Sequence, residues 1–81
     1  MRTIIDVLSD LIASSDPARI ERHDFSDYEL GHLHEAKHWL VELIAQRRGT
    51  EVQVWRADQL LSRIDRAIVD RHASYGSAGE N

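Results

Sequence analysis

Residues 34 to 38 carry the one string in this chain that by itself names a chemistry. They spell His-Glu-Ala-Lys-His, the H-E-x-x-H pattern. On a helix, His34 and His38 lie one turn apart on the same face, where two imidazoles can hold a zinc ion and Glu35 can act as a general base. Glu42 follows one turn further along and is a candidate third ligand. A zinc-dependent hydrolase with His34 and His38 as ligands and Glu35 as base is therefore one hypothesis, and a surface metal site of His34, His38 and Glu42 is another.

The helix that must carry this string places its histidines away from the expected core. Apolar residues recur along it with a 3-4-3 spacing, which is typical of the buried stripe of an amphipathic helix. These residues are Leu33, Ala36, Leu40 and Leu43. Since His34 and His38 fall outside the stripe, we expect them to be solvated. A zinc hydrolase also needs a substrate cleft, and zinc peptidases place their third ligand elsewhere. Solvated histidines are favoured, a surface metal site is the alternative, and no cofactor is indicated.

Length and composition restrict the class of protein. Eighty-one residues suffice for one small domain, and a chain this short has a thin margin of stability that oligomerisation commonly offsets. The chain has no cysteine, which excludes disulfides and thiolate metal sites. Ten basic and 14 acidic residues give a net charge of −4 without a block of either sign. This pattern disfavours nucleic acid as a partner. No apolar run is long enough for a membrane span or a signal peptide, so we expect a cytoplasmic protein.

The pattern of apolar residues and helix signals predicts an all-α fold. Helices are expected over residues 3–14, 27–48 and 51–72, with a short turn of helix from Pro17 to about Arg22. The whole of 1–73 forms one helical domain, and 74–81 form a disordered tail. Residues 51–55 also alternate like a strand, but a single strand would have no partner, so helix is favoured.

Local signals predict where these helices begin and end. Ser26 with Glu29 and Thr50 with Gln53 have the spacing of capping boxes, which predicts two helix starts. Gly49 suits the left-handed residue that closes a helix. Asp16 before Pro17 is a further start signal, with Asp as the N-cap residue and Pro in the first helical position. Phe25 and Leu30 flank the first box as a hydrophobic staple.

The link between the two long helices predicts how they pack. Gly49 and Thr50 form a very short connection, which favours an antiparallel helical hairpin. Each helix of about 22 residues would be roughly 33 Å long, and a pair leaves one side of its apolar stripes open. The N-terminal helix can cover part of this groove and a second copy the rest. We therefore expect an N-terminal helix plus a long antiparallel hairpin, assembled into an oligomeric helix bundle, with a dimer as the first expectation.

Two tryptophans and three arginines are candidate partner-binding residues. The set is Trp39, Trp55, Arg56, Arg63 and Arg66. The tryptophans flank the apolar stripes, where such residues often anchor interfaces, although each can instead cap the core of its own chain. The arginines form a row on one helix and suit carboxylates or phosphates. Acidic residues interleave with them, so a solvated face with local ion pairs is the favoured alternative.

Parts of the sequence resemble small phage-encoded helical-hairpin proteins that blunt bacterial defence or signalling. Ser26 to Glu29 followed by Arg66-Ala67-Ile68 resembles the hairpin family that sequesters cyclic nucleotide messengers. The stretch from His38 through Arg47 resembles small helical anti-activators that bind transcription regulators. The resemblance covers at most half of the chain and assigns no binding residue. It implies a class of protein that is non-enzymatic, oligomeric and acts by binding.

Three functional hypotheses follow. The leading one is a non-enzymatic interaction protein, a phage or bacterial modulator of a host system, which binds a protein partner through its helices. The second is an oligomer that sequesters a small ligand such as a cyclic nucleotide in a pocket of arginine and aromatic side chains. The third, least favoured, is the H-E-x-x-H zinc hydrolase.

Overall fold

The computed structural model is built from helices alone. It describes residues 3–16 and 18–79, and the side chains of those ranges as far as Ala73. The helices are α1 (Ile4–Ala13), α2 (Ala18–Arg22), α3 (Leu30–Ala45) and α4 (Glu51–Gly79). No strand occurs in the described residues, and 51–55 lie in α4. The expectation of an all-helical chain is confirmed.

Reciprocal capping boxes start two of these helices. At α4, the Thr50 backbone N–H donates to Oε1 of Gln53 (3.0 Å), and the Gln53 N–H donates back to the Thr50 hydroxyl (3.2 Å). This capping box confirms the predicted helix start. Thr3 and Asp6 make the same reciprocal pair at the start of α1, which the sequence analysis did not identify. Both boxes satisfy backbone donors that the first helical turn leaves unpaired.

The helix α2 is a single short turn whose start follows from Asp16. Oδ1 of Asp16 accepts a hydrogen bond from the backbone N–H of Ala18 (3.0 Å), as an N-cap side chain does. Pro17, expected in the first helical position, lies outside the described residues. Only Ile20 of α2 is buried, so this turn is anchored to the core by one side chain.

The start of α3 differs from the prediction. The helix begins at Leu30 rather than Asp27, its N-cap is Glu29, and no side chain caps it. The expected box of Ser26 and Glu29 does not form, because the Ser26 N–H donates to Oδ1 of Asp24 instead (2.9 Å). Contacts from distant parts of the chain hold residues 26–28 in a turn, as described below, and these override the local helix signal.

The end of α3 is closed by Arg47, not by Gly49 as predicted. Arg47 adopts the left-handed conformation (φ 49°). Its N–H donates to the carbonyl of Ile44 (3.2 Å), and the N–H of Arg48 donates to the carbonyl of Leu43 (3.1 Å). These two bonds form a Schellman motif with a non-glycine residue at its left-handed position. The helix therefore ends at Ala45, three residues earlier than predicted. Gly49 also has a positive φ of 98° and turns the chain into α4.

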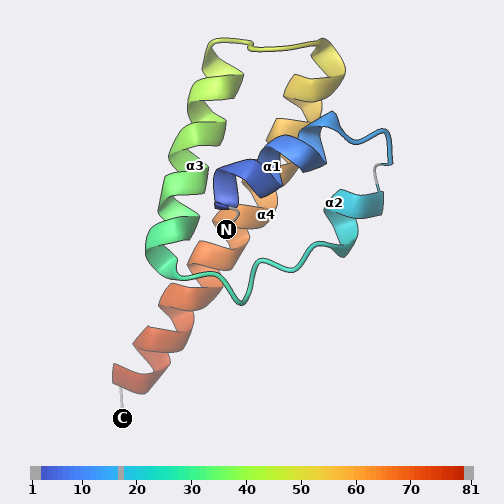
Figure 1. Cartoon of the computed structure of the whole chain (residues 1–81). Coiled ribbons are helices and arrows are strands. Elements are labelled where there is room, and N and C mark those ends of the chain that lie inside the picture. Colours follow the sequence, from blue (N-terminus) through green and yellow to red (C-terminus); the bar gives the residue numbers. More distant parts are fainter. Residues whose placement is uncertain (1–2, 17, 80–81) are drawn as a thin grey trace.

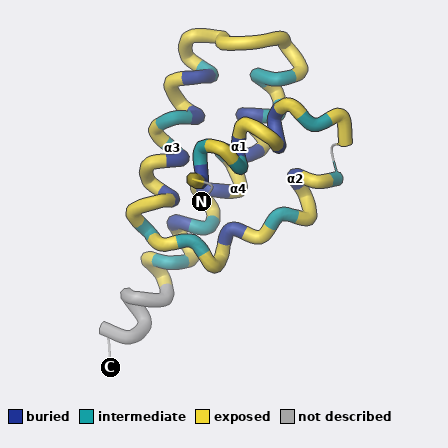
Figure 2. The backbone as a smooth tube through the Cα atoms, in the orientation of Figure 1, coloured by how far each residue is buried: buried dark blue, intermediate teal, exposed yellow. Residues whose placement is uncertain are grey.

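Helices α3 and α4 lie side by side and form the largest helix contact, and α1 packs across both of them (Figure 1). One salt bridge joins the pair, from Nζ of Lys37 to Oδ1 of Asp65 (2.8 Å). The buried residues, dark blue in Figure 2, lie mainly where the helices face one another. They are Ile4, Leu8, Leu11 and Ile12 of α1, Ile20, Phe25, Leu33, Ala36, Leu40 and Leu43, and Ala57, Leu60, Ile64 and Ile68 of α4. The predicted stripe of α3 is fully confirmed as core.

The helix α4 is much longer than α3. It has 29 residues against 16, and its last turns run on beyond α3 (Figure 1). The helix thus extends past the predicted end near His72 as far as Gly79, and residues 80 and 81 of the predicted tail lie outside the described range. Across residues 3–16 and 18–79, none of the helices has the length and apolar character that crossing a bilayer requires.

Candidate functional site

The segment 23–28 connects α2 to α3 and is fastened to α4 by one arginine. Nη2 of Arg71 donates to the backbone carbonyls of Ser26 (2.7 Å) and Tyr28 (2.5 Å). Ser26 and Arg71 are 45 positions apart, so this contact depends on the tertiary fold. It also supplies a hydrogen-bond donor to two backbone carbonyls of the turn.

Three rings gather in the same segment. The rings of His23 and Phe25 meet edge to face with centroids 4.7 Å apart, and His23 and Tyr28 stack at 5.9 Å. Nε2 of His23 lies 2.8 Å from the Tyr28 hydroxyl, within hydrogen-bond distance. Phe25 is buried and inserts toward α4. Burial lowers the pKa of His23; the charge of Arg19 lowers it further, and that of Asp24 opposes the change.

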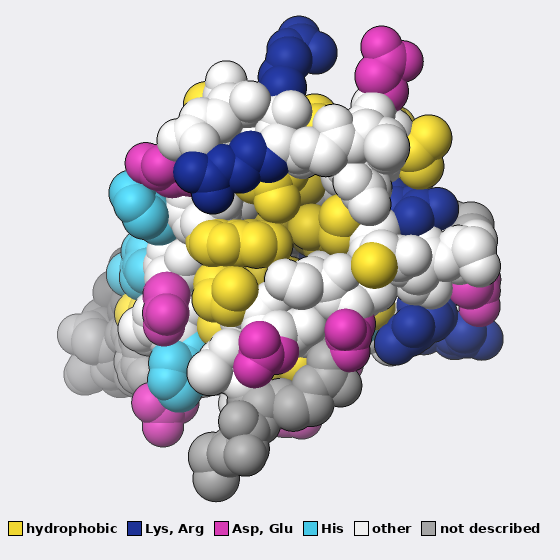
Figure 3. All heavy atoms as spheres, turned by 45° about the horizontal axis from the view of Figure 1, so that its top comes forward, with side chains coloured by type: hydrophobic (Ala, Val, Ile, Leu, Met, Phe, Trp, Pro, Cys, Tyr) yellow, Lys and Arg dark blue, Asp and Glu magenta, His cyan; other side chains and the backbone are white. Residues whose placement is uncertain are grey.

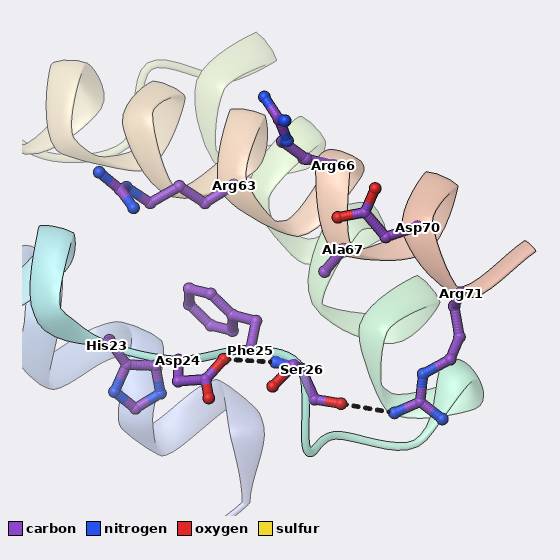
Figure 4. Close-up of a pocket in the computed structure, with 9 residues that line it drawn as sticks. All are labelled: His23, Asp24, Phe25, Ser26, Arg63, Arg66, Ala67, Asp70 and Arg71. Carbon is purple, nitrogen blue, oxygen red and sulfur yellow. Dashed lines mark hydrogen bonds between the residues drawn. The ribbon is translucent and has the colours of Figure 1, made fainter. Parts of the chain in front are cut away.

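Between this segment and α4 lies a pocket of about 400 Å³. One wall consists of His23, Asp24, Phe25 and Ser26, and the other of Arg63, Arg66, Ala67, Asp70 and Arg71. In Figure 4, Phe25 and Ala67 point toward each other across the pocket, and Arg63 extends along it above His23. Arg66 leaves the same wall but points outward (Figure 4). The pocket thus combines an apolar centre with charged groups at its margins.

Some charged side chains of this pocket are already hydrogen-bonded within the chain, and others are not. Arg71 is occupied by two carbonyls. Asp24 accepts a bond from the Ser26 N–H, and hydrogen bonding to the backbone and then the side chain of Ser26 lowers the pKa of Asp24. Arg63, Arg66 and Asp70 are exposed and make no hydrogen bond or ion pair within the described residues. Two arginines and one carboxylate are therefore available to a ligand.

The residues of the H-E-x-x-H string stand apart from this pocket. His34, Glu35, His38 and Glu42 are all exposed, and histidine side chains line the margin of the face in Figure 3, outside its central hydrophobic group. Nε2 of His38 lies 3.7 Å from Oε1 of Glu42, while His34 turns to the ring of His72 (centroids 6.1 Å). Nowhere in the described residues do three or more metal-ligating side chains gather in a way that could hold an ion. The geometry favours solvated histidines.

The remaining candidate residues divide into two groups. Trp39 is half-buried and packs against the core, and Nη1 of Arg56 donates to the backbone carbonyl of Ile12 (2.8 Å). Both contribute contacts within the chain. Trp55, in contrast, is 54% exposed on α4. The fold thus separates two tryptophans that look alike in the sequence.

The pocket brings together Arg63 and Arg66, which the sequence analysis selected, with residues it did not select, chiefly Phe25, Asp70 and Arg71. One signal was present in the sequence: Arg63, Arg66 and Asp70 recur at a spacing of three and four, so they share a side of one helix. No signal places the 23–26 segment opposite them, because that depends on how α1 and α2 return the chain to α4. Comparison with protein-family models, curated proteins and solved structures finds no match to this chain.

Proposed function

We propose that this protein is a small non-enzymatic binding protein that places a helix surface against a partner protein. The observation that carries the proposal is the exposure of Trp55, of which 54% is open to solvent on the outer face of α4. Tryptophan is a large apolar side chain and is enriched among the residues that dominate interface affinity. Burying this ring would add stability to a small core, so its exposure supports a role in binding at the surface.

Further apolar side chains extend this surface. Val52, also 54% exposed, precedes Trp55 by three residues and therefore lies beside it on the helix. Val69, 60% exposed, follows Trp55 by fourteen residues, about four turns, and so returns to nearly the same side. We call Val52, Trp55 and Val69 the outer face of α4. Their exposure supports a docking surface that runs along the helix.

A second copy of the chain is the first partner we propose. The helix α4 runs beyond α3, so its last turns lack a neighbouring helix on that side. A chain of 81 residues has little stability to spare for a long unsupported helix. Pairing of two copies would extend the antiparallel hairpin of α3 and α4 into an oligomeric helix bundle and cover the outer face of α4.

The resemblance to phage-encoded hairpin proteins supports a role for such a surface. Proteins of that kind blunt host defence or signalling by occupying a partner. We propose the same class of action here, in which the chain is an inhibitor or modulator that works by binding.

A photo-crosslinking residue tests the outer face directly. A benzophenone amino acid placed at Trp55 and irradiated in the producing cells should form a covalent adduct, and in the purified protein an adduct of twice the chain mass. The matched control carries the same probe at Val41, an exposed apolar position of α3 (44% exposed). Adducts at position 55 but not at 41 would support the proposal. No adduct at 55 in either setting, or equal adducts at both positions, would refute it.

A further inference from the structure

The pocket between residues 23–26 and α4 carries an inference that goes beyond helix-mediated binding. Its volume of about 400 Å³ lies within the range of sites that hold small molecules. Phe25 and Ala67 form its apolar centre (Figure 4). The side chains therefore suit a small ligand with an apolar or planar part.

The basic margin indicates an anionic group on that ligand. Arg63 extends along the pocket, whereas Arg66, three residues further along the same helix, points outward (Figure 4) and reaches a ligand only by changing its rotamer. Neither makes a hydrogen bond or an ion pair in the part of the chain that the structure describes. A guanidinium donates in a planar fork that matches the oxygens of phosphate and carboxylate. Of these, phosphate presents more acceptor oxygens, so it can engage both arginines at once.

The acidic groups indicate that the ligand also carries donors. Asp70 has a free carboxylate in the pocket, whereas Asp24 is engaged by the backbone and the side chain of Ser26. An inorganic anion would meet only repulsion from these two groups. A ligand with a phosphate at one end and N–H donors at the other would match both margins.

We infer that this pocket binds a small phosphate monoester that carries an amino-bearing ring, of the kind represented by a nucleoside monophosphate. Arg63 holds the phosphate, Arg66 turns inward to assist it, Asp70 accepts from the amino group, and Phe25 supports the ring. Arg71 does not bind the ligand, because its guanidinium holds the backbone of residues 26 and 28. It positions the wall that carries Phe25.

Titration calorimetry with adenosine monophosphate, and separately with inorganic phosphate, tests this site at fixed ionic strength. We expect one nucleotide per chain and weaker binding of phosphate alone. Arg63→Gln should weaken nucleotide binding by about tenfold or more. Asp70→Asn should weaken binding of the nucleotide but not of phosphate. Arg63 and Asp70 are exposed and unpaired in the described residues, so both variants should fold, which circular dichroism checks.

The matched control is the double variant Arg47→Gln, Arg48→Gln, which removes two exposed arginines at the far end of α3. It should leave nucleotide binding within about twofold, whereas non-specific attraction to the chain would fall at least as much in this double variant, which loses two charges, as in Arg63→Gln, which loses one. No binding of the nucleotide at millimolar concentration, or equal losses in Arg63→Gln and the control, would overturn the inference. Neither result would affect the crosslinking test at Trp55, so the two proposals fail separately.

Discussion

The guanidinium of Arg56 in α4 donates a 2.8 Å hydrogen bond to the backbone carbonyl of Ile12 at the end of α1. The two residues are 44 positions apart. Ile12 lies in the last turn of α1, where carbonyls lack helical partners and the helix dipole favours a positive charge. The bond therefore caps α1 and fastens it to α4 at the same time.

Arg56→Ala should accordingly destabilise the fold. A partly buried hydrogen bond from a charged donor contributes on the order of 1–2 kcal/mol, and its loss leaves the Ile12 carbonyl unpaired. We expect the free energy of unfolding in urea to fall by about that amount. Arg63→Ala is the control, since Arg63 is exposed and unpaired within the described residues, and should change stability by less than about 0.5 kcal/mol. Equal effects of the two variants would contradict this role for Arg56.

Replacement by alanine should have opposite effects on the stability of the protein at Gly49 and at Gly31. A Cβ on Gly49 would clash with Oε1 of Gln53, the atom that accepts from the Thr50 N–H, and φ at Gly49 is 98°. Gly49→Ala should therefore break half of the capping box and strain the turn, at a cost of about 1–2 kcal/mol. Gly31 lies in α3 with no atom within 4 Å of the added Cβ, so Gly31→Ala should stabilise by about 0.5–1 kcal/mol. In thermal unfolding, the midpoint temperature should fall for Gly49→Ala and rise for Gly31→Ala.

Arg47→Gly should stabilise the protein. Arg47 occupies the left-handed position of the Schellman motif at φ 49°, a conformation that costs roughly 1–2 kcal/mol for a residue with a Cβ. Glycine removes that cost, although it gains entropy in the unfolded chain, so we expect a net gain of about 0.5–1 kcal/mol. A lower unfolding midpoint in urea would show that the Arg47 side chain contributes more than its strain costs.

Acidification should weaken the fold through His23. Burial lowers the pKa of His23 below its ordinary value of 6.5, so the unfolded chain takes up this proton more readily than the folded one. The stabilising effect of neutral His23 is complete above about pH 6.5 and is lost as the pH falls through the lowered pKa. Thermal melts at pH 7.5 and 5.5 should show a loss on acidification that is smaller in His23→Gln. An identical loss in both proteins would exclude His23 as its source.

The sequence determined which stretches are helices and which faces they bury. The 3-4-3 stripe of Leu33, Ala36, Leu40 and Leu43 is buried in the core as predicted. Apolar residues at this spacing lie on one face of a helix, and that face is the one that packs away from water. The capping box of Thr50 and Gln53 formed because its two bonds lie within a single turn. Signals of this kind need no distant residue.

Only the tertiary structure decided the features that depend on distant contacts. Ser26 and Glu29 have the spacing of a cap, yet Asp24 and Arg71 hold the turn before α3 in another conformation. The tryptophans look equivalent in the chain, but packing against the core covers one and leaves Trp55 in solvent. The pocket arises because α1 and α2 carry residues 23–26 back to α4. Local patterns record propensity and burial, whereas the site depends on which elements meet, and that is set by packing over the whole chain.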